Sequence, residues 1–375
     1  MLSIDGMHIE INPTPNDCRE AAARRVKEAL VELRSILKGE YIIPTAITSK
    51  KFNTASFRNF SPEDLKMGCK PSYNSYSKNV SKLPKNAEKI RFRSAGGHMH
   101  FGYEKIGYLQ HFSKNINYGE PVAIWIGNSN LKSAIKIPSI HTSDKEIIEI
   151  FSNHYKTLNP KQAFVVRGTE NITLSSPETA IKYLDIIIGV PITMLENDAQ
   201  DRRRIYGRAG EYRLPSYGLE YRVPSSMLIR DPRLYTMFLG WARLALGIAK
   251  YKISKYKTSS IANAIIAELD SIKNSELQKA INTGDKKLLK NIFEKGIGYI
   301  CKTETTYFGN NSTNRRVLLY FMDIIIRRPS YIFDASKIFN NWLNFEGQDG
   351  IDSSVSRQSQ ARQNDIKSAW SNYAS

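Results

Sequence analysis

The chain has 375 residues, 41% of them hydrophobic, which fits a globular protein with one large domain or two smaller ones. Its 54 Lys and Arg against 36 Asp and Glu give a formal net charge of +18, so an anionic ligand or surface must be considered. Three isolated cysteines argue against a disulfide framework or a zinc knuckle. The sequence shows no signal-peptide pattern and no long apolar run, so we expect a cytoplasmic protein with no membrane partner.

The first elements expected are a strand and a helix. Residues 7–12 alternate between apolar and polar side chains, which predicts a strand with Glu10 on its polar side. Asp17 then opens a helix with Glu20 at the spacing of a capping box, and Gly39 ends it. Residues 40–90 are rich in Pro, Ser, Asn and Tyr, which predicts loops and short strands with one brief helix at 61–67.

Two histidines follow in an alternating pattern. In a strand, His98 and His100 would point to the same side, and this is the shortest way for one strand to present two imidazoles to one ligand. Glycines on both sides would let a ligand approach the backbone. The alternative is two strand histidines that face water, and the pattern alone does not decide between them.

The middle and the end of the chain are expected to be mostly helical. We expect short strands at 122–126 and 163–166, and helices at 143–158 and at 177–189, the second ended by Pro191. After Asp231 the apolar spacing predicts helices at 234–256, 260–274, 275–283, 285–295 and 317–326. From Gly347 the tail is rich in Ser, Gln and Arg and is predicted to be weakly ordered.

The most charged stretch, residues 201–226, contains six arginines, three carboxylates and four tyrosines. If its two halves are strands, Glu211 and Arg213 share one side of the first and Glu220 and Arg222 share one side of the second. Carboxylates hold hard metal ions, and guanidinium groups hold phosphates or carboxylates. A solvated, salt-bridged hairpin is the alternative, but the repeated Glu-Tyr-Arg favours a functional site.

Four motifs follow one another along the chain. They are Asp5-Gly6 with Glu10 and Asn12-Pro13; Gly68-Cys69 with Pro71 and Tyr73-Asn74; residues 93–98 with His100 and Gly102; and Tyr206-Gly207, Ala209-Gly210, Arg213, Tyr217-Gly218, residues 220–222 and Ser225. In series they resemble the phage-encoded type 2 carboxylate–amine ligases of the glutamine synthetase and glutamate–cysteine ligase superfamily. The resemblance covers about residues 1–230, and no part of the family can be placed after about residue 260.

The resemblance implies an α+β fold. A curved antiparallel sheet, a glutamine synthetase-like half-barrel, would carry the active site on its concave face and helices on its convex face, followed by a mostly helical C-terminal region. We expect a ligase domain at 1–257, a helical region at 258–346 and the weakly ordered tail at 347–375. In the family a strand with an acidic Asp-Pro-Glu element precedes the Asp5 motif, and the 1–257 domain is expected to lack it.

The resemblance also implies an ATP-dependent ligase, located in the host cytoplasm if it is phage-encoded. ATP would phosphorylate a substrate carboxylate, and an amine would displace the phosphate to form an amide. Such chemistry needs Mg²⁺ or Mn²⁺ and positive side chains at the phosphates. The implied metal ligands are Glu10, His98, His100 and Glu220; the implied catalytic residues are Arg213, Arg222 and Glu220; and the implied nucleotide-binding residues are Arg202, Arg203, Arg204, Arg213 and Arg222.

The implied substrates are an amine and the carboxylate of an amino acid, a peptide or a cell-wall fragment, and a homo-oligomer is compatible with the superfamily. An alternative is a basic protein of the same fold, without turnover, that associates with nucleic acid or virions; the net charge of +18 favours it. A third interpretation, a metallohydrolase at His98 and His100, needs further histidines, and His111, His141 and His154 lack the matching context.

Overall fold

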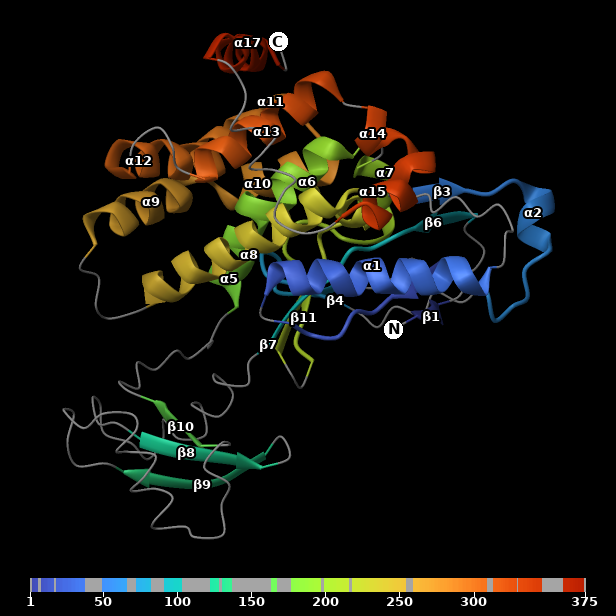
Figure 1. Ribbon diagram of the computed structural model, residues 1–375, viewed down its shortest axis with the longest axis horizontal. Helices are drawn as coiled ribbons and strands as arrows, with labels where there is room; N and C mark the ends of the chain where they lie inside the picture. Colours follow the sequence, from blue (N-terminus) through green and yellow to red (C-terminus); the bar gives the residue numbers. More distant parts are fainter. Residues whose placement is uncertain are drawn as a thin grey trace.

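The computed structural model describes most of the chain. The described residues are 2–5, 8–16, 18–37, 49–65, 72–81, 91–102, 122–127, 130–136, 163–166, 177–196, 199–215, 218–253, 259–308, 313–328, 330–345 and 360–373. Helices form most of the described part, and small antiparallel sheets lie among and beside them (Figure 1). The expected helix at 143–158 and residues Asp17 and Tyr217 lie outside the described part.

A five-stranded antiparallel sheet carries most of the candidate site. Its strand order is β5 (Val80–Ser81), β4 (Ser72–Asn74), β11 (Glu211–Arg213), β12 (Gly218–Tyr221) and β7 (Met99–Gly102). Opposed residues share a face of a sheet, so the register separates an apolar face, with Leu219, Tyr221 and Met99, from a polar one. The three apolar side chains are buried in the main core.

The remaining described strands form three smaller pieces. A hairpin joins β1 (Leu2–Asp5) to β2 (His8–Ile11), and β3 (Ser49–Lys51) pairs with β6 (Phe92–Ser94). The third contains β8 (Val122–Gly127), β9 (Asn130–Lys136) and β10 (Ala163–Val166). The strands predicted at 7–12, 122–126 and 163–166 are thus confirmed. Within the described residues the sheets do not join into one curved sheet, so the half-barrel is not confirmed.

The most deeply buried helix lies behind the sheet. It consists of α5 (Glu178–Leu184), the π-helical turn η3 (Asp185–Gly189) and α6 (Val190–Leu195), and every side chain from Ala180 to Leu195 except Lys182 is buried. The prediction that Pro191 ends this helix is wrong. Proline lacks the N–H that an α-helix would use at this position, and the wide turn just before it lets the helix continue.

The other described helices complete the helical part of the molecule. They are α1 (Arg19–Ile36), α2 (Thr54–Arg58), α7 (Ala199–Ile205), α8 (Pro232–Ile253), α9 (Ser260–Ser271), α10 (Asn274–Thr283), α11 (Lys286–Phe293), the π-turn η5 (Glu294–Gly298), α12 (Tyr299–Phe308), α13 (Thr313–Arg327), α14 (Ser330–Phe333) and α15 (Ile338–Leu343). The predicted helical region after Asp231 is therefore confirmed, whereas the described part of the expected helix at 61–67 is a turn.

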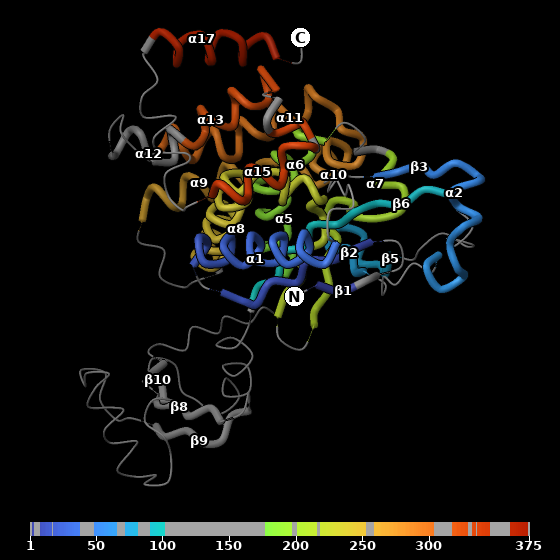
Figure 2. The backbone as a smooth tube through the Cα atoms, turned by 45° about the vertical axis from the view of Figure 1, so that its right-hand side comes forward, coloured from blue at the N-terminus to red at the C-terminus, as the bar shows by residue number. Residues whose placement is uncertain are grey.

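One apolar core joins the early helices to the late ones. The same buried cluster contains Ala23 in α1, Ile187 in η3, Phe293 in α11 and Trp370 in the last helix, α17 (Gln360–Ser371). Figure 2 shows α17 above α13, which it contacts. The prediction for the tail did not include this helix, and the division at 257 and 346 stays a prediction. No described helix is long and apolar enough to cross a membrane.

Candidate functional site

The polar face of the central sheet brings together residues from three strands. The register places Arg213 of β11 opposite Glu220 of β12, and Glu220 opposite His100 of β7. Side chains directly opposite one another in an antiparallel sheet have Cβ atoms roughly 5 Å apart and interact. The prediction that Glu220 and Arg222 share one side of their strand is confirmed, because both side chains lie on this face.

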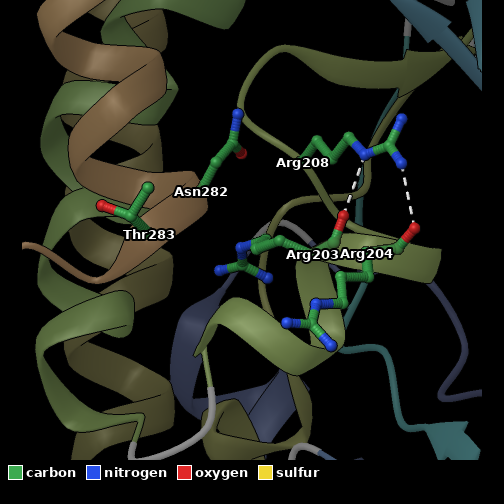
Figure 3. Close-up of a pocket in the computed structure, with 5 residues that line it drawn as sticks. All are labelled: Arg203, Arg204, Arg208, Asn282 and Thr283. Atoms are coloured by element: carbon green, nitrogen blue, oxygen red, sulfur yellow. Dashed lines mark hydrogen bonds between the residues drawn. The ribbon is translucent and has the colours of Figure 1, made fainter.

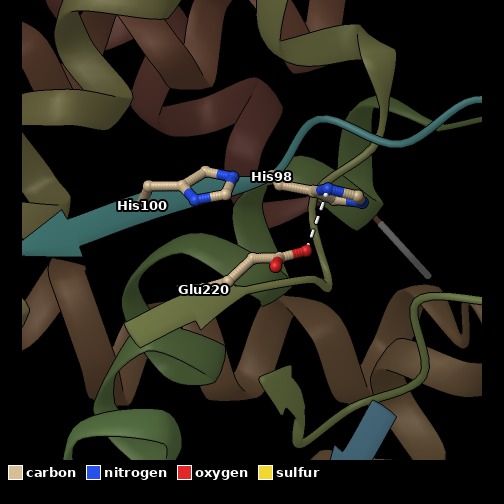
Figure 4. A group of neighbouring side chains, drawn as sticks. All are labelled: His98, His100 and Glu220. Atoms are coloured by element: carbon tan, nitrogen blue, oxygen red, sulfur yellow. Dashed lines mark ion pairs between the residues drawn. The ribbon is translucent and has the colours of Figure 1, made fainter. Parts of the chain in front are cut away.

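The carboxylate of Glu220 is the centre of the group. It is buried and accepts two hydrogen bonds from Arg213, Nε to Oε2 at 2.8 Å and Nη2 to Oε1 at 2.7 Å. Its Oε1 also lies 3.2 Å from Nε of Arg222 and 3.2 Å from Nδ1 of His98 (Figure 4). Such charge-assisted, two-pronged pairing fixes the carboxylate in direction and position.

The two histidines and Glu220 could hold a metal ion. One ligand atom from each of His98, His100 and Glu220 lies within 4.8 Å of the others. Burial lowers the pKa of both imidazoles, that of His98 well below its usual 6.5, and Arg213 and Arg222 contribute in the same direction. The imidazoles are therefore neutral at pH 7, the form that binds metal.

The donor set passes a direct test of fit for such an ion. His98 Nε2 is buried without a hydrogen-bond partner among the described residues, while Nδ1 of the same ring faces Glu220. An ion shared with Glu220 would therefore bind at Nδ1, where the neutral imidazole and the carboxylate both offer lone pairs. Two nitrogens with a carboxylate suit Mn²⁺ better than Mg²⁺.

Glu10 lies beside this group but is not one of the three clustered ligands. It is half-buried in β2, and its charge raises the pKa of His100, against the stronger effect of burial. The hairpin of β1 and β2 thus brings a second carboxylate within electrostatic range of the site. Glu10 as a direct metal ligand stays a prediction.

Arg222 supports the site from within the protein. Its guanidinium is buried, donates from Nε to Tyr206 Oη at 2.9 Å and from Nη1 to Ser72 Oγ at 2.7 Å, and lies over the Tyr206 ring. The His98 ring packs on the same tyrosine. The sequence assigned no role to Tyr206, and its contacts with an arginine and a histidine are visible only in the structure.

The predicted phosphate group Arg202 to Arg204 is split by the structure. These residues lie in helix α7, so the two expected strands are confirmed at residues 211–213 and 218–221 but not at the start of the stretch. Arg202 is buried and donates to the carbonyls of Val223 and Pro224, both at 2.7 Å. Arg203 is buried too and binds Val223 and Glu196.

These buried arginines hold the chain that precedes His98. The carbonyl of Pro224, which Arg202 binds, also accepts the N–H of Gly97 at 2.9 Å, and Ser225 bridges Gly96. A side chain on Gly97 would meet the Ser225 carbonyl, so only glycine allows this close approach. The structure thus gives Arg202 and Arg203 contacts within the protein, close to a segment that leads into a candidate ligand.

Arg204 is exposed and lies 3.6 Å from Asp201, an ion pair of little energetic weight. Figure 3 shows it beside a cavity of about 350 Å³ that is also lined by Arg203, Arg208, Asn282 and Thr283. Arg208 donates to the carbonyls of Arg203 and Arg204, so its guanidinium supports the end of α7. A nucleotide-binding role for Arg204 stays a prediction.

Asp185 is a buried carboxyl that sequence analysis did not assign to the site. It was visible as the charge that interrupts the apolar run of residues 183–195, which was the available signal. It accepts hydrogen bonds from Tyr221 Oη at 2.6 Å and Tyr76 Oη at 2.8 Å. Burial raises its pKa to about 7, although both tyrosines act in the opposite direction.

This pKa predicts a pH effect on stability. Between about pH 4 and pH 7 the unfolded chain has lost the Asp185 proton and the folded chain keeps it, so this group makes the free energy of unfolding fall as pH rises. An asparagine side chain at this position cannot titrate. We therefore expect Asp185→Asn to become more stable relative to the parent chain as pH rises, measured by urea unfolding at about pH 5, 6 and 7. A constant difference over that range would contradict this assignment.

The comparisons with known proteins give one match. No curated protein and no solved structure matches the chain. A sequence model of the family described as "Phage phiEco32-like COOH.NH2 ligase-type 2" matches residues 160–343, which include Arg213, Glu220 and Arg222 but not the histidines. The match continues through the helices after residue 260, so the expected limit of the resemblance at about residue 230 was too early. Residues 160–343 of the chain are therefore similar to the phage phiEco32-like COOH.NH2 ligase-type 2 family.

Proposed function

We propose that this protein is an ATP-dependent carboxylate–amine ligase, phage-encoded and active in the host cytoplasm. The observation that carries the proposal is the arrangement around Glu220: a buried carboxylate between two arginines and two neutral histidines, in a chain similar to a ligase family. The carboxylate substrate would be that of an amino acid, a peptide or a cell-wall fragment, and the second substrate an amine.

In the proposed reaction, a carboxylate oxygen of the substrate attacks the γ-phosphorus of ATP, and ADP leaves. The amine nitrogen then attacks the carbonyl carbon of the acyl phosphate, phosphate leaves, and the nitrogen loses a proton to give the amide. Both steps gather negative charge on phosphate oxygens, and neither needs a covalent protein intermediate. Glu, His and Arg side chains are therefore sufficient, and no nucleophilic serine or cysteine is required.

His98, His100 and Glu220 are the proposed ligands of Mg²⁺ or Mn²⁺, with Glu10 adding negative charge nearby. The ion would neutralise polyphosphate charge when bound. Arg213 keeps 27% of its side chain exposed and can present its guanidinium to a phosphate, whereas Arg222 is buried. Arg222 is proposed to act by holding Glu220 and Tyr206 in place.

The proposal is tested by ADP release. Purified protein with ATP, Mn²⁺ or Mg²⁺, and mixtures of amino acids or cell-wall peptides is expected to release ADP only when metal, carboxylate and amine are all present. Calorimetry provides the independent measurement of nucleotide binding. If no nucleotide binds in the presence of either metal, the ligase proposal fails.

A further inference from the structure

Asp185 connects the buried helix to the strands that carry the candidate site. Its side chain is fully buried in the π-helical turn η3. Besides the hydroxyls of Tyr221 and Tyr76, it accepts a hydrogen bond from the backbone N–H of Gly210. Three donors on one buried carboxylate satisfy most of its acceptor capacity and fix each donor in place.

The three donors belong to three strands of the central sheet or lie directly beside them. Tyr221 lies in β12 between Glu220 and Arg222, Gly210 directly precedes β11, and Tyr76 follows β4. Because neighbouring residues of a strand point to opposite faces, Tyr221 reaches the helix while Glu220 and Arg222 reach the site. A displacement of the tyrosine therefore displaces both charged groups.

Two glycines make room for these contacts. A Cβ at Gly189 would lie 2.8 Å from Tyr221 Oη and 3.3 Å from Oδ1 of Asp185. A Cβ at Gly210 would lie 2.6 Å from the Tyr76 ring, and this residue has φ +81°, a conformation that favours glycine. Because these two residues are glycines, no side chain stands between Asp185 and its hydrogen-bond donors.

We propose that Asp185 is a positioning residue for the site: through Tyr221, Tyr76 and Gly210 it sets the spacing of Glu220, Arg213 and Arg222 relative to the histidines. Its part in catalysis rests on the ligase function proposed above. Its part in the geometry of the site does not, because the contact between His98 and Glu220 can be observed without any ligand.

The test uses two variants and one matched control. Asp185→Asn keeps the shape of the side chain but replaces one acceptor oxygen with an NH2 donor, and Tyr221→Phe removes only the hydroxyl. Tyr183→Phe is the control, because Tyr183 is equally buried and also donates to an aspartate, Asp270, at 3.0 Å, outside the site. If Asp185→Asn does not fold, Tyr221→Phe carries the test.

Two measurements are made on each folded protein. The first is the imidazole NMR spectrum of protein labelled with ¹⁵N-histidine, which has only six such residues; it reports the environment of His98 Nδ1 without metal or nucleotide. The second is Mn²⁺ affinity by calorimetry. We expect both variants to shift the His98 signal and to weaken Mn²⁺ binding about tenfold, as loss of supporting hydrogen bonds does at metal sites, and the control to change neither.

The outcomes separate this proposal from the ligase proposal. An unchanged His98 signal in folded Asp185→Asn and Tyr221→Phe overturns the positioning role, and so does an equal shift in Tyr183→Phe. If the parent protein binds neither Mn²⁺ nor nucleotide but both variants still shift His98, the positioning role is supported and the ligase proposal fails.

Discussion

Glu220→Gln is expected to abolish Mn²⁺ binding and ADP release. Glutamine keeps the shape of the side chain but loses the charge that faces Arg213, Arg222 and His98. Removing one partner of a buried ion pair leaves the other uncompensated, so we also expect the free energy of unfolding to fall by about 3 kcal/mol. Calorimetry with Mn²⁺, urea unfolding and the ADP assay measure the three effects.

Asp231→Asn is the matched control for this loss of charge. Asp231 is buried and binds Arg233 through the same two-pronged geometry, at 2.9 Å and 2.7 Å, outside the site. Arg233 is also as exposed as Arg213, 25% against 27%. We expect the control to lose comparable stability and to keep Mn²⁺ binding. Unchanged Mn²⁺ affinity in Glu220→Gln would remove Glu220 from the metal site.

Arg213→Met is expected to have the opposite effect on the metal. Arg213 occupies both oxygens of Glu220 and carries a positive charge next to the ligands. A unit charge about 5 Å from a cation costs on the order of 1–3 kcal/mol at a partly exposed site. We therefore expect Mn²⁺ to bind about tenfold more tightly in the absence of nucleotide, while ADP release falls at least about a hundredfold because a phosphate-binding group is lost.

Arg233→Met is the control for the general effect of removing a partly exposed arginine that pairs with a buried carboxylate. We expect it to leave Mn²⁺ affinity within about twofold of the parent protein, since its partner Asp231 lies outside the site. Weaker Mn²⁺ binding in Arg213→Met would show that the arginine organises the metal site instead of competing with the ion.

The central pairing at the site could be predicted because it depends on the alternation of strands. His98 and His100, Glu220 and Arg222 each share a face by spacing alone, and these four residues meet in the structure. The partner of Glu220 was not predictable, because the register that opposes Arg213 to it is set by the connection between the two strands and by burial.

Arg202 and Arg203 show where the charge pattern misleads. Three successive arginines indicate a phosphate or surface group, but a helical turn directs them to different sides, and two of them bind buried carbonyls. Buried arginines also add nothing to the surface charge that favoured nucleic-acid binding. The helix itself was missed because the whole of residues 201–226 was interpreted as two strands.

The sequence motifs placed the end of the family resemblance too early, at about residue 230, because the later helices carry no polar motif. Short polar motifs are visible in a sequence, whereas helices such as α10 and α11 contribute apolar side chains that many sequences could supply. The family match nevertheless extends through both helices. Their packing against η3 and α6 explains why they belong with the strands: they cover the back of the helix that holds Asp185.

The shared core has a consequence for how the protein unfolds. Residues on both sides of position 257 contribute to one buried cluster, and the helix of residues 178–195 loses its cover if the later helices separate from it. A boundary at 257 would therefore separate two parts that differ in sequence motifs but unfold together. Denaturant is expected to melt both parts in a single transition, with the strands of the site and the distant helices losing structure at the same midpoint.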